Sequence, residues 1–458
     1  MESLRHLCQF LSNLDLQEAD PSLIAHARLI LIDTLGVMVA GGTEGELSSL
    51  LQALSFGDNK QSLASCLGRH EQVNPLIAAL INGIAGSRLE FEEGNSWAFG
   101  HPAIQIVPAL VAQAEGQRTS GKELLEALVA GYECGVRVSR ASKVRKGLHP
   151  SGTWGTVGAA AAVAKLRARS PSALYEILNL SASFTISPYV KNAFVGKNVA
   201  YTFAGMASFL GFLSNVFFDA GFRADESSLR MTFSKFVSDV FKEEELDREL
   251  GKEFFLLKNY FKPYPSCRFT HPALDALKAI LRNVSFRRRE VERIRVETFQ
   301  AAAHCDTKAP PNLEAVRFSL PYLIAGMLSF GDITLDTIQR ISVQDDQLRK
   351  LAARVEVRSI PEYEALRPVR NPARVTLQLK NGQTHVCEVK NPSGEEGCPL
   401  SQETIQEKFL SLTVPILGKD RSEAFWEKAI QLEKENDIRP LIALLRLPRD
   451  VSYGKGST

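Results

Sequence analysis

The first 260 residues alternate between apolar stretches with helical spacing and short polar or glycine-rich breaks. The clearest stretch follows Asp20-Pro21 and ends at Gly41-Gly42. A capping residue followed by proline in the first turn, with glycine at the end, predicts one long helix here. The same periodicity predicts further helices over 75–88, 102–115, 122–140, 156–167, 172–183, 201–217 and 229–241.

The pattern changes after Lys262. Residues 270–283 and 316–331 again predict helices, but 291–299 and 353–360 alternate as strands do. Residues 373–390 alternate on both sides of Asn381-Gly382, which is typical of a hairpin with a tight turn. Helical spacing returns at about Leu400. We therefore predict a mainly α protein with two parts: a large all-helical domain (1–262 and 400–458) and a smaller α+β lid domain (263–399).

The composition is that of an ordinary globular protein. Of 458 residues, 45% are hydrophobic and 23% charged, and the net charge is +2. Such a balance favours neither a nucleic acid nor a membrane surface as partner. Seven cysteines without a CxxC motif favour reduced thiols in the cytoplasm. The N-terminal residues do not resemble a signal peptide, and no segment approaches the roughly 18 uninterrupted apolar residues of a membrane span.

The segment Leu89–Pro102, LEFEEGNSWAFGHP, holds the densest group of ionisable side chains. It contains Glu90, two further glutamates, and His101. Pro102 suits the first turn of a helix, so His101 should lie near the N-cap, where the helix dipole lowers the pKa of an imidazole. A neutral histidine there could act as a base or simply cap the helix.

A second His-Pro pair precedes another predicted helix, in LHPSGTWGTVG. His149 stands there beside small residues whose backbone N–H groups could bind a carboxylate, or it could be an exposed histidine above a capped helix. Lys197, in AFVGKNVAYTFAG, is either a surface lysine or an anion ligand.

The segment KPYPSCRFTH lies at the predicted domain boundary, where small-molecule clefts often form. Its prolines restrain the backbone that carries Lys262 and Arg268. Tyr322, in the apolar helix of the lid, could serve packing or donate a hydrogen bond to a substrate. The chain has no nucleotide, dinucleotide, zinc-protease or α/β-hydrolase signature.

Taken in order, these segments resemble the MmgE/PrpD family of 2-methylcitrate dehydratases and cis-aconitate decarboxylases. The resemblance rests on RLILIDTLGVMVAG, INGIAGSRLEFEEG with GHP, HPSGTWGTVGAAAAVAKL, GKNVAYTFAGMAS, KPYPSCRFTHPALDAL and RFSLPYLIAGML. It implies a helical domain with an α+β lid, usually as a homodimer, and a site without metal or cofactor that acts on di- or tricarboxylates. It also implies catalytic or substrate-contact positions at His101, His149, Lys197, Lys262 and Tyr322.

One element departs from the family pattern. The lyases carry a DFDDT-like element before the first His-Pro pair, whereas this chain reads Glu90-Phe91-Glu92-Glu93-Gly94. A glutamate thus replaces the leading aspartate, and Gly94 replaces the threonine. Asn95 or Ser96 would have to supply the missing polar group. The departure makes an epimerase of an iminodisuccinate-like dicarboxylate a serious alternative to a lyase.

The resulting hypothesis is a cofactor-independent lyase, a dehydratase or decarboxylase, that transfers a proton next to a carboxylate of its substrate. We expect catalytic roles for His101, His149, Glu90 and Tyr322, and substrate binding by Lys197, Lys262, Arg268 and Asn95. The alternatives are an epimerase with the same carbanion chemistry and a non-catalytic protein that binds carboxylates. We expect a small polycarboxylate as partner, a homodimer, and no metal.

Overall fold

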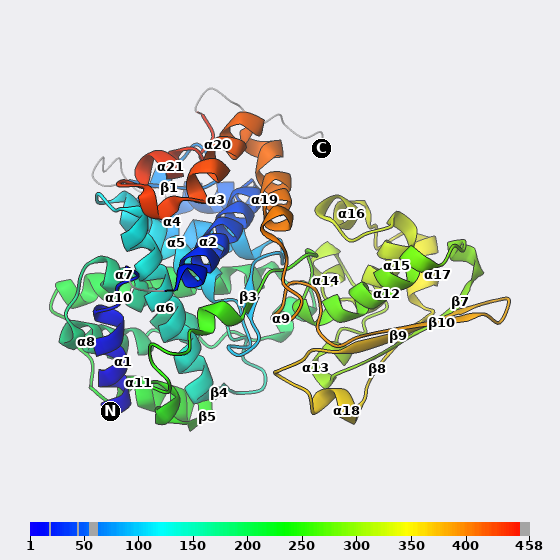
Figure 1. The fold of residues 1–458 in the computed structure, drawn as a ribbon, viewed down its shortest axis with the longest axis horizontal. Coiled ribbons are helices and arrows are strands. Elements are labelled where there is room, and N and C mark those ends of the chain that lie inside the picture. Colours follow the sequence, from blue (N-terminus) through cyan, green and yellow to red (C-terminus); the bar gives the residue numbers. More distant parts are fainter. Residues whose placement is uncertain (18–19, 44, 55–62, 449–458) are drawn as a thin grey trace.

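The computed structural model describes residues 1–17, 20–43, 45–54 and 63–448. Figure 1 shows a large helical domain, coloured blue to green with the orange-to-red C-terminal helices, beside a smaller domain that contains the main sheet. The prediction of a mainly α fold is confirmed. The helices of the larger domain's N-terminal part are α1 Glu2–Ser12, α2 Pro21–Gly41, α3 Gly45–Leu54, α4 Pro75–Ser87, α5 Pro102–Glu115, α6 Gly121–Ala141, α7 Trp154–Leu166, α8 Pro171–Ala182 and α10 Thr202–Asp219.

Small residues let the central helices pack closely. A Cβ atom added to Gly83 of α4 would lie 2.6 Å from the Cα of Gly205 in α10, so the two backbones touch where they cross. The predicted start of α2 is also present, because the Asp20 side chain accepts a hydrogen bond from the Ser22 N–H and Pro21 occupies the first turn. Sequence and packing therefore agree in the core of this domain.

Two helical stretches in the described chain, Pro21–Gly41 and Asn198–Asp219, are long and apolar enough to cross a membrane. Inside the fold, however, 67% and 56% of their apolar windows are buried. Burial by neighbouring helices accounts for this apolar character, as it does for core helices in general.

The C-terminal helices return to the N-terminal part. Helices α19 Gln402–Leu417, α20 Lys419–Ala429 and α21 Arg439–Ala443 contribute Phe409 and Trp426 to the same hydrophobic core as α2. The lid has a separate core, built from residues between 264 and 379 with Ala193. The predicted domain boundaries at 262/263 and 399/400 stay a prediction.

The lid is a four-stranded sheet with helices packed against it (Figure 1). The strand order is β10-β9-β7-β8; β7 and β8 are parallel and the other pairs antiparallel. Strands β9 and β10 form the hairpin predicted around Asn381-Gly382. The lid elements are α12 His271–Asn283, β7 Val291–Thr298, α15 Leu320–Phe330, α17 Asp346–Ala352, β8 Val355–Ser359, β9 Ala373–Leu379 and β10 Thr384–Val389.

The helix predicted over 229–241 is wrong in most of its length. Only α11, Ser228–Met231, is α-helical; a π-helical turn over Thr232–Phe236 and strand β5, Ser238–Phe241, follow it. The Ser238 hydroxyl accepts hydrogen bonds from the N–H groups of Lys143 and Val240, which holds β5 against β4, Ser142–Val144. Long-range pairing here overrides the local helical pattern.

Candidate active site

A cavity of about 140 Å³ lies between the helical domain and the lid. The loop between α4 and α5 and the loop before α7 form one side of it, and residues from the lid form the other. Its polar and charged lining residues are Ser87, Glu90, Glu92, Asn95, Ser96, His101, His149, Ser151, Tyr201, Tyr260, Arg268, Arg367 and Asn371.

A short antiparallel pair of strands organises the floor of the cavity. Strand β3, Gly94–Asn95, pairs with β6, Asn259–Tyr260, so that Gly94 lies opposite Tyr260. Side chains alternate along extended backbone, and the same register places Lys262 opposite Glu92. This pairing joins the acidic segment to the K-x-x-P segment across more than 160 residues of sequence.

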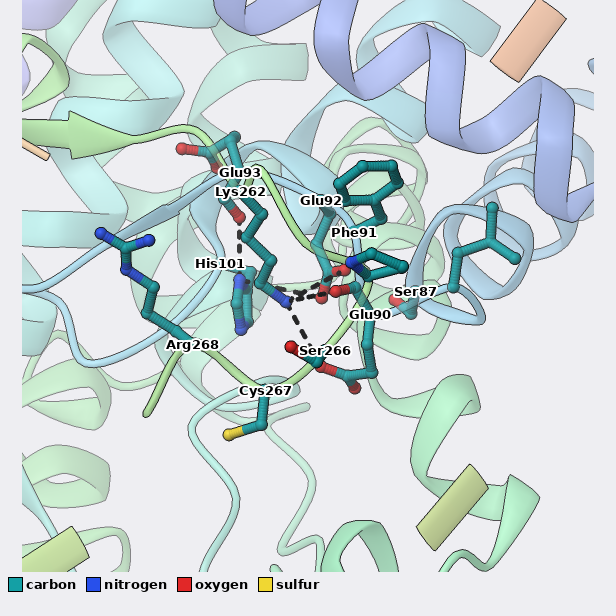
Figure 2. Close-up of polar contacts among 12 residues, drawn as sticks. Ser87, Glu90, Phe91, Glu92, Glu93, His101, Lys262, Ser266, Cys267 and Arg268 are labelled. Carbon is teal, nitrogen blue, oxygen red and sulfur yellow. Dashed lines mark hydrogen bonds and ion pairs between the residues drawn. The ribbon is translucent and has the colours of Figure 1, made fainter. Parts of the chain in front are cut away.

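Lys262 is the centre of a buried charge cluster (Figure 2). Its Nζ donates to the Glu90 carbonyl at 3.0 Å, and lies 3.3 Å from Glu90 Oε2 and 3.5 Å from Glu92 Oε2. Burial raises the pKa of both carboxyls, although Lys262 partly opposes this. Burial would also lower the pKa of the ammonium, but the two glutamates outweigh it and the net shift is upward. Lys262 therefore holds Glu90 and Glu92 in place and is itself fully buried behind them.

Glu90 has a left-handed backbone, with φ of 51°. A residue with a side chain pays an energetic penalty for this conformation and keeps it only where surrounding contacts impose it. Here the contact is the Lys262 hydrogen bond to the Glu90 carbonyl. The fold thus holds the Glu90 carboxyl at the cavity despite local strain.

A second buried ion pair lies behind the acidic loop. Lys408 of α19 donates to the Phe91 carbonyl at 2.7 Å and lies 2.7 Å from Asp33 Oδ1 of α2. Its Nζ also lies 4.1 Å from the centre of the Phe91 ring. The C-terminal helices therefore support the loop from the side away from the lid.

His101 is the residue before α5, as predicted, but its ring does not cap the helix. Its Nδ1 lies 2.8 Å from the Glu93 carbonyl, so Nδ1 carries the proton and donates it there. The Glu93 carboxyl takes the capping role and accepts from the Ala103 N–H at 2.8 Å. Burial, together with Lys262, lowers the pKa of His101 to about 4. The imidazole is therefore neutral near pH 7.

His149 has the opposite arrangement. Its Nδ1 accepts a hydrogen bond from the Ser151 N–H at 3.1 Å, which leaves the proton of the neutral ring on Nε2. Burial, and to a lesser extent the nearby His101, lower its pKa to about 3. The next N–H, of Gly152, donates to Gln105 Oε1 at 2.9 Å. The backbone groups that the sequence suggested for carboxylate binding are thus engaged inside the protein.

The two histidines present complementary nitrogens to one cavity. His101 has a free lone pair on Nε2, and His149 has an N–H on Nε2. A neutral imidazole with a free lone pair accepts a proton, and one with a free N–H donates a proton or a hydrogen bond. The hydrogen-bond partners therefore distinguish a proton acceptor from a hydrogen-bond donor, which the sequence could not.

The lid contributes two arginines. Arg268 is paired with Glu395 at 3.1 Å and stacks over the Tyr260 ring at 4.4 Å. Arg367 forms no ion pair with a carboxylate in the described part of the chain. Its guanidinium lies 4.4 Å from the Phe299 ring centre, and its Nε donates to Asn371 at 3.2 Å. Arg367 is therefore a cation at the cavity with capacity left for an anion.

The structure does not bring every predicted residue to the cavity. Lys197 is exposed and does not line it. Tyr322 is buried in the lid core, where its hydroxyl donates to the Val343 carbonyl at 3.4 Å. Asn95 lines the cavity, but its amide is engaged with the backbone of Phe255, Trp97 and Ala98. Of the substrate-binding set, Arg268 alone lines the cavity with a charged side chain.

Several residues at the cavity escaped the sequence analysis, among them Tyr260, Arg367 and Asn371. Tyr260 had a usable signal, because it stands two residues before Lys262 and so shares its face of an extended strand. Arg367 and Asn371 lie in a lid loop with no distinguishing motif.

Glu90, Glu92 and His101 lie close enough to hold a metal ion, with ligand atoms within 4.8 Å of one another. The Lys262 ammonium, however, already lies within 3.5 Å of both carboxylates. A second cation at the same oxygens would be repelled by it. The donor set therefore fits an ion-paired cluster better than a metal centre.

The buried Glu93 carboxyl should make the stability of the fold depend on pH. Burial raises the pKa of its carboxyl to about 8, from an ordinary value of 4.5. The folded state therefore binds this proton more tightly than the unfolded state. The resulting stabilisation is complete below pH 4.5 and is lost as the pH rises through about 8.

We expect Glu93→Gln, which mimics the protonated acid, to flatten this dependence. Denaturant unfolding between pH 5 and pH 8 should show wild type losing up to about 1.4 kcal/mol per pH unit relative to the variant. Parallel stability curves for the two proteins would contradict a buried, proton-bearing Glu93.

Comparison with known proteins identifies the family of this chain. Residues 5–249 match the MmgE/PrpD N-terminal domain and residues 264–434 the MmgE/PrpD C-terminal domain. Similar curated proteins include the cis-aconitate decarboxylases of Aspergillus terreus (strain NIH 2624 / FGSC A1156) and Mus musculus. The first is 22% identical over 96% of this chain and 95% of its own length, the second 26% over 93% and 90%. The chain therefore belongs to the MmgE/PrpD family.

Proposed function

We propose that this protein is a cofactor-independent lyase that acts on a small di- or tricarboxylate by moving a proton at a carbon next to a carboxylate. The observation that carries the proposal is the pair of neutral histidines with complementary tautomers at one cavity. General acid–base catalysis requires a proton acceptor and a proton donor within reach of the same substrate. The similar cis-aconitate decarboxylases support a substrate of this class.

In a dehydration, His101 Nε2 takes the proton from the carbon, and the C–H electron pair forms the new double bond as the C–O bond breaks. The hydroxyl, held by a hydrogen bond from His149 Nε2–H, leaves as water with the proton that His101 has taken up, so both imidazoles end in their neutral forms. In a decarboxylation, the C–C bond to a carboxylate breaks and carbon dioxide leaves. The electron pair passes into the neighbouring conjugated carboxylate, and the carbon then takes a proton from a water molecule that His149 Nε2–H orients, leaving hydroxide.

Charge at the cavity suits an anionic substrate on the lid side. Arg367 has no carboxylate partner in the described chain, and Arg268 is held beside it by Glu395. Glu90 and Glu92 also face the cavity. Burial raises the pKa of both carboxyls, so each can take up a proton when a substrate carboxylate lies beside it. Lys262 positions these two glutamates and does not itself line the cavity, in contrast to the substrate contact that the sequence predicts.

The test is a screen of small polycarboxylates (methylcitrate, cis-aconitate, citrate, iminodisuccinate and tartrates) by NMR in D₂O. A lyase gives an alkene or a decarboxylated product, with deuterium at the carbon that is protonated. Failure of every candidate to react or to exchange a proton would overturn the proposal.

The second candidate is an epimerase. A two-base epimerase also needs two proton-transfer groups at one cavity, as His101 and His149 are, and Gly94 departs from the lyase pattern at the threonine position. In the same experiment, deuterium uptake with inversion and no alkene identifies an epimerase.

A non-catalytic carboxylate-binding role is the third reading. It is disfavoured because His101, His149 and Glu90 share one cavity. Binding of a polycarboxylate without turnover or exchange would support it. The homodimer and the cytoplasmic location stay predictions.

A further inference from the structure

The phenol of Tyr260 lines the cavity next to Gly94, the position at which this chain has glycine in place of the threonine of the family pattern. Its strand, β6, pairs with β3 so that Tyr260 lies directly opposite Gly94. A Cβ atom added to Gly94 would lie 2.3 Å from the Tyr260 hydroxyl oxygen and 2.9 Å from His101 Nδ1. Any side chain at 94, a threonine included, would therefore displace the phenol. Glycine at this position makes room for it.

The Tyr260 hydroxyl has no hydrogen-bond partner among the described residues, although the residue is only 5% exposed. The phenol ring is buried, but the hydroxyl oxygen is not among the fully buried unpaired atoms, so it is accessible from the cavity and free to bind a partner there. Tyr260 also lines the cavity, with its ring edge-on to His101 at 6.3 Å and under the Arg268 guanidinium at 4.4 Å. An unpaired donor beside the base points to a partner that enters the cavity.

We propose that Tyr260 is a catalytic residue whose hydroxyl donates a hydrogen bond to the substrate carboxylate that gains negative charge as His101 removes the proton. Tyr260 would supply the polar group that threonine offers in the lyase pattern. Burial raises the pKa of the phenol well above 10, so the hydroxyl keeps its proton and remains a donor. A donor aimed at developing charge stabilises the transition state more than the ground state. The inference rests on the proposed function.

Tyr260→Phe tests the role, because it removes one oxygen and keeps the ring. With the substrate found in D₂O, we expect kcat to fall about 10²–10³-fold, as for other lost oxyanion donors, while KM changes far less. The melting temperature should stay the same or rise, because the lost hydroxyl has no partner in the protein. Unchanged kcat in the variant would overturn the role of Tyr260 and leave the proposed function standing.

Tyr264→Phe is the matched control. The Tyr264 hydroxyl donates to Asp275 at 2.7 Å within the lid and does not line the cavity. This variant should lower the melting temperature and keep kcat. Calorimetry of the wild type with tricarballylate, a saturated tricarboxylate, distinguishes failure of the proposed function from failure of the role of Tyr260. If the wild type neither binds this probe nor turns over any polycarboxylate, the proposed function fails, and the role of Tyr260 fails with it.

Discussion

Replacing His101 with glutamine should lower kcat by about 10²–10⁴-fold on a substrate that the enzyme dehydrates or epimerises, because these reactions begin with removal of a proton by His101. Glutamine can still donate to the Glu93 carbonyl, as His101 Nδ1 does at 2.8 Å, so the loop should keep its shape. It cannot accept a proton in place of Nε2. Steady-state kinetics and deuterium exchange should fall together, because both depend on removal of the same proton.

The pH profile of the wild type is a second test of the role of His101. Since burial holds the pKa of His101 at about 4, the base stays neutral throughout the neutral range and the acid limb of kcat should fall near that value. An acid limb at 6.5, the ordinary pKa of a histidine, would contradict a buried base. His70→Gln is the control: this histidine is exposed and distant from the cavity lining, and its loss should leave kcat unchanged.

Replacing Lys262 with methionine should destabilise the fold by about 3–5 kcal/mol. The change keeps most of the side-chain volume but leaves Glu90 and Glu92 buried without their cation. Chemical denaturation at pH 7 measures the loss. Because burial raises the pKa of both carboxyls, they should take up protons as the pH falls, and the defect should shrink below neutral pH.

Two controls separate charge from packing. Lys252→Met removes an ion pair with Glu249 from the surface, where the lysine side chain is 79% exposed, and should cost at most about 1 kcal/mol. Combining Lys262→Met with Glu90→Gln and Glu92→Gln removes the uncompensated charge and should recover much of the stability. A triple variant as unstable as Lys262→Met would assign the loss to packing.

The sequence predicted the elements whose signals are local. The capped start of α2, the start of α5 at Pro102 and the hairpin at Asn381-Gly382 all appear as expected, because a few neighbouring residues decide each of them. The helix over 229–241 failed because Ser238 pairs with a strand almost 100 residues earlier. No local pattern records such a partner.

The candidate site likewise combines residues that local motifs predict with contacts that only the fold creates. His101 and His149 could be found because each stands in a short motif, but their tautomers depend on the Glu93 carbonyl and the Ser151 N–H, which the sequence does not orient. Lys197 and Tyr322 match family positions, yet neither lines the cavity here. Arg367 reaches it only because the lid folds back onto the helical domain.

The support that Lys408 gives to the acidic loop has a consequence for how the protein is made. Domains generally fold as units during synthesis, starting from the N-terminus. The loop with Glu90 and His101 and helix α2 with Asp33 are translated early, but the contact of the loop to Lys408 requires α19, more than 300 residues later. The loop that carries Glu90 and His101 can reach its final form only after α19 has emerged, so translation products that stop before α19 should lack a finished site.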